Sequence, residues 1–387
     1  MTIKINKTEN RILEIFTGMT TWNSKWSNGL VSAAAVVLGF LAATLLLLAI
    51  GRNPSGMYQS ILQVVSGFDA RRGTWNIRHP GEWLVSSIPL ILCGLSMGFA
   101  ARAGLFNIGA EGQYIAGITA AQLIAIYFPP IPVLHLTVAV CGAVIAGAVW
   151  GGIVGFFKAR YKVSEVVATI MMNYIPLYLH RIITMRIPGS STFRTPPLPA
   201  TASLSSGMLE SITNNSRLNH GLWLTIIALI IYWLVMEKTV FGFSLRAAGF
   251  NRDAALYAGM RVNANITCAM AIAGSFAGLA GAVISLGLFT NGRVMTGFDG
   301  YGFDGIAVAL VGNSTAPGIA VAGLLFGMLR SAQPLMQARL IPREIASLIM
   351  GLVVVFISLR AGIQLFIEWR MKEKIRKQKT SDSGETS

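Results

Sequence analysis

Long apolar segments separated by shorter polar ones fill the chain between residues 30 and 362. A helix needs about 20 apolar residues to cross a bilayer, and most of the segments have roughly this length. The pattern therefore predicts an all-α polytopic membrane protein with about ten transmembrane helices. We expect these helices at 31–50, 83–101, 108–128, 133–157, 163–184, 220–236, 262–289, 303–313, 316–335 and 344–361.

Two places in this pattern suggest broken helices. The segment 303–313 is too short for a full crossing, and a break at residues 313–318 follows it directly. The region around Asn107 and Gly109 has the same half-length character. Interrupted segments at corresponding places in two halves of a transporter indicate an internal repeat. Because the first half starts outside and the second starts inside, the repeat would be inverted.

The segment 100–117 is the most polar stretch inside the apolar region. It carries an arginine, an asparagine, a glutamate, a glutamine and four glycines between two apolar runs. Polar groups and irregular backbone are tolerated at membrane depth only where protein or a water-filled cavity surrounds them. We therefore expect this segment to pack inside the helical assembly, close to a path that a polar solute follows.

Composition supports a membrane protein and argues against a soluble one. Hydrophobic residues make up 53% of the chain, charged residues only 12%, and the mean hydropathy is +0.61. A soluble domain would carry about 25% charged residues. Three cysteines all fall within predicted helices, and no metal-binding spacing, nucleophile elbow or phosphate-binding loop occurs. The sequence thus predicts a protein that is not an enzyme and needs no cofactor or metal.

The formal net charge of +15 would suit a nucleic-acid partner, but its distribution suggests membrane lipid instead. All ten lysines fall in segments that the ten-helix topology puts on one side, whereas the 21 arginines are divided between both sides. Lysine bias of this kind marks the cytoplasmic side, where anionic lipid attracts basic residues. Both termini are therefore expected to be cytoplasmic, and no nucleic acid is expected to bind.

The chain is expected to divide into three parts. Residues 1–29 form a polar cytoplasmic segment whose apolar positions recur near helical spacing, as in a helix on the membrane surface. Residues 30–362 form the transmembrane domain. Residues 363–387 form a basic tail that is expected to be disordered and cytoplasmic.

Glu111 and Asn173 each allow two interpretations. Glu111 could contact the solute, but a glutamate near a helix N-terminus is also stabilised by the helix dipole. Asn173 lies in the middle of a predicted span, where its amide needs a partner on a neighbouring helix or on a passing solute. Tyr174 beside it could line the path or belong to the core. The candidate path residues are Asn107, Glu111, Gln113, Asn173, Tyr174 and Asp304.

The loop from Glu237 to Arg261 is long and apolar for a connector between membrane helices. We expect two short helical pieces around Gly249, with Asp253 capping the second. Small residues such as Ala254 would allow another protein to approach closely. An ordinary loop is the alternative, but a cytoplasmic docking site explains the composition better.

Three segments of the chain resemble signatures of the membrane permeases of ABC importers. They are Gly104-Leu-Phe-Asn-Ile-Gly-Ala-Glu-Gly-Gln113, Glu165-Val-Val-Ala-Thr-Ile-Met-Met-Asn-Tyr174 and Leu245-Arg-Ala-Ala-Gly-Phe-Asn-Arg-Asp-Ala-Ala255. The superfamily is that of branched-chain amino acid and ribose permeases, and the nucleoside permease subgroup is the closest match. Gly51-Arg-Asn-Pro54 and Pro89-Leu-Ile-Leu-Cys-Gly-Leu95 also look like that subgroup. The resemblance covers roughly residues 30–362.

This resemblance implies an importer permease in the plasma membrane that pairs with a second, different permease. A separate cytoplasmic ATPase would drive it, since no nucleotide-binding motif occurs here. A lipid-anchored binding protein would deliver a nucleoside from outside. The residues expected to couple to the ATPase are Arg246, Ala248, Gly249, Asp253, Ala254, Ala255 and Gly259.

Three other functions compete with that of a nucleoside permease. A sugar or branched-chain amino acid permease of the same superfamily fits the fold, although the long 51–82 loop and the 104–113 segment favour nucleosides. An ion-coupled secondary transporter would need carboxylates in mid-span to bind protons or sodium ions. A membrane-embedded enzyme would need a catalytic constellation, which the sequence lacks.

Overall fold

The computed structural model describes residues 24–342, 344–356 and 359, and their side chains from residue 33 onward. The expectations for 1–23 and for the tail after 359 lie outside the described residues. The chain divides into two compact units. One is formed by the chain up to Gly51 and from Leu348 on, and the other by Arg52–Ser347.

The first unit contains α2, Ser24–Ala49, and the part of the helix Glu344–Phe356 that begins at Leu348. One face of α2 presents a buried residue every fourth position, at Ala35, Gly39, Ala43 and Leu47. A Cβ atom on Gly39 would lie 2.7 Å from Cγ2 of Val353. A stripe of mostly small residues lets helices approach closely in a membrane, so these two helices pack through it.

The second unit is almost entirely helical, as the apolar pattern predicts. Its α-helices are α3 Ser55–Ser66, α4 Arg78–Arg102, α5 Ala110–Tyr127, α6 Leu134–Tyr161, α7 Glu165–Met185, α8 Gly207–Ile212, α9 Gly221–Lys238, α10 Val240–Phe250, α11 Arg252–Tyr257, α12 Val262–Gly287, α13 Tyr301–Val311 and α14 Ala316–Gln337. The short 3-10 helix η1 spans Ala200–Ala202.

Two small antiparallel sheets lie in the connections of this unit. In the first, β1 Phe68–Asp69 pairs with β2 Thr74–Trp75 as a hairpin. In the second, β3 Arg194–Pro197 pairs with β4 Asn291–Arg293, which joins two connections far apart in sequence. The sequence analysis did not identify these strands, α3 or α8, because all of them lie in polar connections without a long periodic pattern.

The centre of the second unit is made of α4 and α12, whose lengths are mostly buried. Helices α13 and α14 pack against α4, while α5 and α6 pack against α12. The contact between α6 and α12 is close enough to require glycine, because a Cβ atom on Gly274 would overlap the backbone of Gly147. The absence of side chains at these points lets the two backbones touch.

Within the described residues, six helices are long and apolar enough to cross a membrane: α4, α6, α7, α9, α12 and α14. Every predicted segment contains a helix, although α13 has only 11 residues and therefore has the predicted half length. The predicted total of ten crossings is not established by these lengths and stays a prediction.

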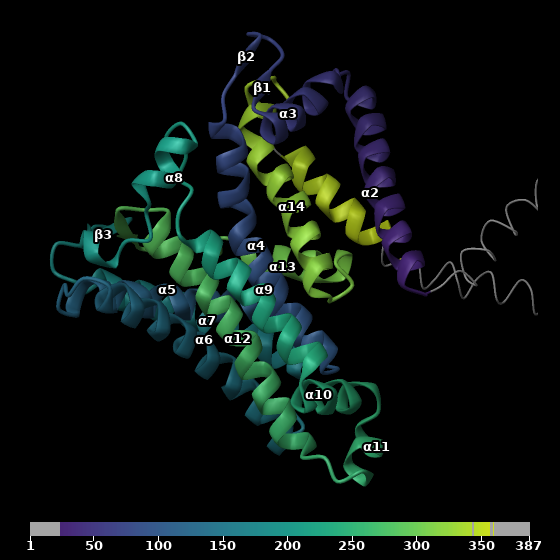
Figure 1. The fold of residues 1–387 in the computed structure, drawn as a ribbon, viewed down its shortest axis with the longest axis vertical. Helices are drawn as coiled ribbons and strands as arrows, with labels where there is room; N and C mark the ends of the chain where they lie inside the picture. Colours follow the sequence, from purple (N-terminus) through teal and green to yellow (C-terminus); the bar gives the residue numbers. More distant parts are fainter. Residues whose placement is uncertain (1–23, 343, 357–358, 360–387) are drawn as a thin grey trace, which may run out of the picture. The chain divides into compact units, whose positions relative to one another are not determined.

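The second unit has two distinct ends (Figure 1). Helices α10 and α11 lie at one end, and β1, β2 and α3 lie at the other. The C-terminal part of α6 lies beside the first part of α12, since a Cβ atom on Gly155 would lie 2.9 Å from Cα of Thr267. The lysines of this unit are Lys158 in the last turn of α6, Lys162 directly after α6, and Lys238 at the end of α9. Both helices finish at the α10 end.

Candidate functional site

The connection between α4 and α5 is fixed by buried amides. The Asn107 amide donates to Ser96 Oγ at 3.0 Å and to Gln113 Oε1 at 2.9 Å. Gln113 Nε2 donates back to Asn107 Oδ1 at 3.1 Å. Both amides are buried, and they satisfy each other's hydrogen-bonding needs. They therefore hold the polar segment 103–109 against α4 at a fixed position.

Asn173 binds the same segment from α7. Its Oδ1 accepts from the Gly112 backbone N–H at 2.8 Å, and its Nδ2 donates to the Ile108 carbonyl at 3.1 Å. The side chain is almost completely buried. Of the two partners considered for this amide, the structure provides the neighbouring protein backbone, so Asn173 positions the start of α5.

Glu111 binds the N-terminus of α13. Its two carboxylate oxygens accept from the backbone N–H groups of Gly300 at 2.8 Å and Gly302 at 2.6 Å. The first N–H groups of a helix have no partner inside the helix, and the cap residue Gly300 has no side chain to supply one. Glu111 on α5 thus caps the N-terminus of α13, which favours the structural interpretation of this carboxylate.

Aromatic and charged side chains gather around the beginning of α13. The Tyr174 ring lies 5.2 Å from the Phe298 ring in an edge-to-face arrangement, and Phe298 lies 5.8 Å from Phe303. Tyr174 is 48% exposed and Phe303 is 39% exposed. Partly exposed aromatic rings in a row can stack against a flat aromatic molecule.

Asp304 lies on the same helix and pairs with Arg330 of α14 at 3.0 Å. The Arg330 guanidinium is centred 3.9 Å above the ring of Tyr301, and it also donates to the backbone carbonyl of Asp299 at 2.9 Å. Both charged side chains are about one quarter to one third exposed. This ion pair supplies hydrogen-bonding groups beside the aromatic row.

The sequence analysis singled out Tyr174 and Asp304 but missed Phe298, Tyr301, Phe303 and Arg330. A signal was present in the run 298–303, where three aromatic residues alternate with glycine and aspartate immediately before a short helix. The importance of Arg330 could not be inferred, because its pairing depends on how α14 packs.

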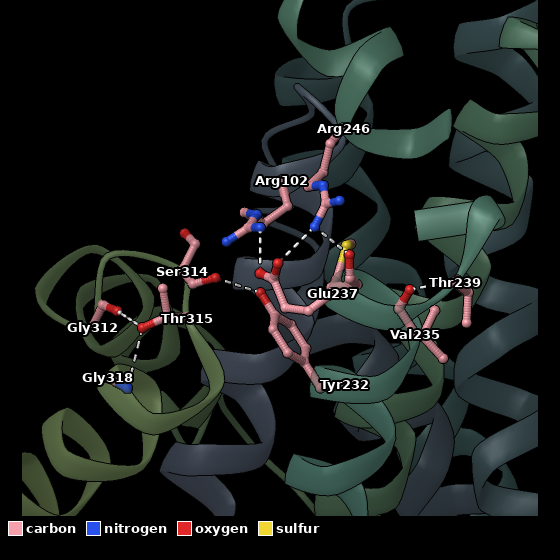
Figure 2. A network of polar contacts seen from close by, with 11 residues as sticks. Arg102, Tyr232, Val235, Glu237, Thr239, Arg246, Gly312, Ser314, Thr315 and Gly318 are labelled. Carbon is pink, nitrogen blue, oxygen red and sulfur yellow. Dashed lines mark hydrogen bonds and ion pairs between the residues drawn. The ribbon is translucent and has the colours of Figure 1, made fainter. Parts of the chain in front are cut away.

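At the α10 end, Glu237 joins three helices (Figure 2). It accepts from Arg102 Nη2 of α4 at 2.6 Å and from Arg246 Nη1 of α10 at 2.7 Å, while Glu237 itself is on α9. Nearby, the Tyr232 hydroxyl donates to the Ser314 carbonyl between α13 and α14 at 2.7 Å. This junction ties α10 to the central helix α4.

Gly249 of α10 contacts the polar segment directly. A Cβ atom on Gly249 would lie 2.6 Å from both the Ala103 carbonyl carbon and the Gly104 nitrogen. Gly104 has φ +72, a conformation that favours glycine. The two helical pieces expected around Gly249 are α10 and α11, but the break between them lies at Asn251, because α10 continues through Gly249 and ends at Phe250. Gly249 is instead the point where α10 meets the 103–109 segment.

The predicted cap of α11 is also wrong. Asn251, in extended conformation, is the cap residue, and its Oδ1 accepts from the Ala254 N–H at 3.0 Å. Asp253 lies in the first helical turn, where the helix dipole favours a carboxylate. A residue two positions before Asp253 in sequence has the same capping chemistry, which explains why sequence reasoning chose the wrong one.

The remaining predicted coupling residues differ in exposure. Ala254 and Gly259 are exposed, whereas Ala255 is buried against the rest of the chain and Ala248 is half-buried. Sequence reasoning missed two exposed aromatic side chains here: Phe250, which ends α10, is 96% exposed, and Tyr257, which ends α11, is 97% exposed. Large exposed aromatic side chains are frequent in interfaces between proteins.

These features define the class of the protein. Long apolar helices pack together with the short helix α13, and buried amides, a buried carboxylate and partly exposed aromatic rings lie between them. Within the described ranges, no three His, Cys, Asp or Glu side chains converge as metal ligands. The chain is a multi-pass membrane transport component. It belongs to the family described as branched-chain amino acid transport system / permease component, whose match covers residues 80–358.

The chain is also similar to curated proteins over most of its length. It is 39% identical to the guanosine ABC transporter permease protein NupP of Bacillus subtilis (strain 168), covering 90% of this chain and 98% of that protein. It is 36% identical to the nucleoside ABC transporter permease protein NupB of Lactococcus lactis subsp. cremoris (strain MG1363), covering 89% and 94%. It is 32% identical to the glucose ABC transporter permease protein TsgB13 of Haloferax volcanii, covering 71% and 75%. This protein is therefore a plasma membrane protein of the ABC permease type.

Proposed function

We propose that this chain is the permease subunit of an ATP-driven importer and forms the path by which nucleosides cross the plasma membrane. The observation that carries the proposal is the near full-length similarity to permeases named for guanosine and nucleosides. The aromatic row Tyr174–Phe298–Phe303 agrees with it, because a nucleobase is a flat ring that stacks on aromatic side chains.

The path follows the aromatic row and the Asp304–Arg330 pair. Tyr174 and Asp304 contact the solute directly in this proposal, because both are partly exposed. Asn107, Glu111, Gln113 and Asn173 act indirectly. Their hydrogen bonds hold the 103–112 backbone and the beginning of α13, and so set the shape of the path.

The proposed topology has ten membrane helices and an inverted repeat. It is supported by reciprocal packing, since α13 and α14 of the second half lie on α4 of the first, while α5 and α6 of the first half lie on α12 of the second. The three lysines at the α10 end support a cytoplasmic location for that end. With ten crossings, both termini are cytoplasmic, so that residues 1–29 and 363–387 flank a membrane domain at 30–362.

A separate ATPase is proposed to dock on α10 and α11 at the cytoplasmic end. The docking surface consists of Phe250 and Tyr257 with the exposed small residues Ala254 and Gly259. Movement of α10 would reach the path through Arg246 at the Glu237 junction and through Gly249 at the polar segment. The other proposed partners are a second permease subunit and a substrate-binding lipoprotein outside the cell.

Uptake by cells tests the proposed function. Deleting the gene for this chain should abolish the uptake of radiolabelled guanosine at low external concentration. Expressing the chain again should restore this uptake. Substitution of the ATPase's catalytic residue should abolish uptake to the same extent. Uptake that persists in that ATPase variant but stops when the proton or sodium gradient is collapsed would indicate an ion-coupled transporter.

A sugar permease is the second candidate, because a relative named for glucose covers much of the chain. Competition separates the two candidates. An excess of unlabelled guanosine or adenosine should block uptake through this chain, whereas glucose and leucine should leave it unchanged. Stronger competition by glucose than by nucleosides would assign the chain to sugars.

A further inference from the structure

A polar cavity of about 420 Å³ lies at the end of the second unit opposite α10. The β1–β2 hairpin, α3 and the residues after α14 surround it, all within Arg52–Ser347. Its charged lining residues are Arg71, Arg72, Arg339 and Asp69. Three guanidinium groups thus share one carboxylate, which leaves the cavity with an excess of positive charge.

Arg339 is the most enclosed of these cations, with only 4% of its side chain exposed. It donates to the neutral groups Ser60 Oγ at 2.5 Å and Gln63 Oε1 at 3.0 Å. Among the described carboxylates, the one within 4 Å is Asp69, at 3.9 Å and without a hydrogen bond. A buried charge is stable when it is paired at close range, and this one is not.

Two other arginines of the unit form ion pairs in which two nitrogens donate hydrogen bonds to one carboxylate. Arg217 binds Glu82 through Nε at 3.1 Å and Nη2 at 2.7 Å, and Arg293 binds Asp299 through both terminal nitrogens at 2.7 and 2.8 Å. The hydrogen bonds that Arg217 donates to the Glu82 carboxylate raise the pKa of Arg217. By contrast, burial and the neighbouring charge of Arg71 lower the pKa of Arg339, although Asp69 opposes them.

Asp69 is not free to neutralise the whole cluster. Its Oδ1 accepts from the Arg71 backbone N–H at 3.0 Å, and its Oδ2 lies 4.0 Å from Arg72 Nε. The Arg72 side chain is 83% exposed and reaches solution at the edge of the cavity. A carboxylate entering from outside would therefore meet available donors on Arg71 and Arg72 and a buried positive charge behind them.

The rim suggests a protein rather than a small anion. Trp75, Ile77 and Leu340 adjoin the lining residues in sequence and are more than half exposed. Leu340 also has φ +59, a conformation that is uncommon for leucine and costs energy. Exposed apolar side chains around arginine are typical of an interface with another protein.

We propose that this arginine pocket receives an aspartate or glutamate side chain of the substrate-delivering lipoprotein, and that the apolar rim packs against the surrounding surface of that protein. This docking site rests on the proposed importer function, which puts the α10 end in the cytoplasm and the pocket outside. The arginines would then hold the lipoprotein at the mouth of the path.

The test compares lipoprotein binding to complete importers in nanodiscs of zwitterionic lipid. The double variant R71E/R72E reverses two exposed charges, and its affinity for the soluble form of the lipoprotein should fall at least about tenfold. The double variant R186E/R194E is the matched control, since it makes the same charge change on exposed side chains of the connection between α7 and α8, which the proposed topology puts on the same side of the membrane. Its affinity should change less than about twofold.

Each result decides between the pocket and an alternative. A lipoprotein in which one aspartate or glutamate is changed to arginine can be combined with R71E/R72E. If this charge swap restores binding, the changed residue is the side chain that enters the pocket. Unchanged binding in R71E/R72E, or an equal loss in R186E/R194E, would overturn the proposal. Binding that requires anionic lipid, or is displaced by inorganic phosphate at constant ionic strength, would also overturn it, in favour of a lipid or a free anion.

A further measurement separates this proposal from the importer function. Wild-type and R71E/R72E complexes should retain the ATPase equally and hydrolyse ATP at the same rate without lipoprotein. If the wild-type complex fails to bind the ATPase or the lipoprotein, the importer function itself is contradicted. If the wild-type complex binds both proteins, but R71E/R72E binds the lipoprotein as tightly as wild type does, only the pocket is rejected.

Discussion

Single residues show which features of the site could be predicted. The sequence marks Asn107, Glu111, Gln113 and Asn173 as unusual, because polar side chains in apolar segments need partners. It cannot identify those partners. Glu111 bonds Gly300 and Gly302, which lie 189 and 191 residues away, and this depends on how α5 and α13 pack. The residue types were therefore predictable, whereas their structural role was not.

The Glu111→Gln variant tests whether this carboxylate is a helix cap. Glutamine has one carbonyl oxygen to accept a hydrogen bond and adds a donor facing the two N–H groups. We expect the protein to lose about 1–3 kcal/mol of stability, measured as a lower melting temperature in detergent. Transport per folded molecule should stay close to wild type.

The control for this variant is Glu165→Gln. It removes the same charge from a partly exposed ion pair with Lys158 and should cost less than about 1 kcal/mol. If Glu111→Gln keeps the wild-type melting temperature but transports poorly, Glu111 contacts the solute and the cap is not its main role.

At the scale of elements, helices were predictable and their breaks were less so. Apolar length predicts α4, α6 and α12 closely, because burial in membrane or protein requires continuous apolar sequence. The break between α10 and α11 was predicted at Gly249 and occurs at Asn251. Glycine is required at position 249 because the backbone of Ala103 and Gly104 lies too close for a side chain. The sequence alone does not show whether a glycine serves a close contact or a turn.

Gly249→Ala tests the contact between α10 and the polar segment. The added methyl group would overlap backbone atoms of Ala103 and Gly104, and relieving this overlap should cost about 1–3 kcal/mol. The melting temperature should fall, and more ATP should be hydrolysed for each molecule transported. Gly207→Ala is the control, because no atom lies within 4 Å of its added methyl group. If both variants have the same melting temperature and the same ATP use per transported molecule, the contact at Gly249 contributes neither to stability nor to coupling.

Ala254→Trp tests the docking surface. Ala254 is exposed on α11, so that the protein should fold normally. A clash with the ATPase costing about 3 kcal/mol would weaken docking roughly a hundredfold. Uptake should be lost and less ATPase should co-purify. The control Met208→Trp puts the same side chain at an exposed position on α8. Normal uptake and ATPase retention by Ala254→Trp would move the docking site elsewhere, with the C-terminal end of α6 at Lys158–Lys162 as the next candidate.

At the scale of the molecule, charge and packing together support one orientation in the membrane. Lysine positions predict the cytoplasmic end from sequence, and the second unit gathers Lys158, Lys162 and Lys238 at the end that carries α10. The exchange of helices between the two halves could only be suggested by the short segment 303–313. Reciprocal packing on α4 and α12 is a property of the folded chain.

Labelling of intact cells tests this orientation. A membrane-impermeant amine reagent should leave all three lysines unmodified until the membrane is made permeable. Thr74→Cys, in the hairpin at the opposite end, should react with an impermeant maleimide in intact cells. Modification of Lys238 from outside would reverse the orientation and rule out cytoplasmic docking on α10.

Transport by the purified importer tests the central claim most directly. The complete complex is reconstituted into liposomes, and uptake of radiolabelled guanosine is measured with lipoprotein outside and ATP inside. We predict accumulation against a gradient that requires ATP, lipoprotein and this chain, and that continues when ion gradients are collapsed. Accumulation driven by an ion gradient without ATP, or ATP-driven accumulation of glucose or leucine but not of nucleosides, would contradict the account.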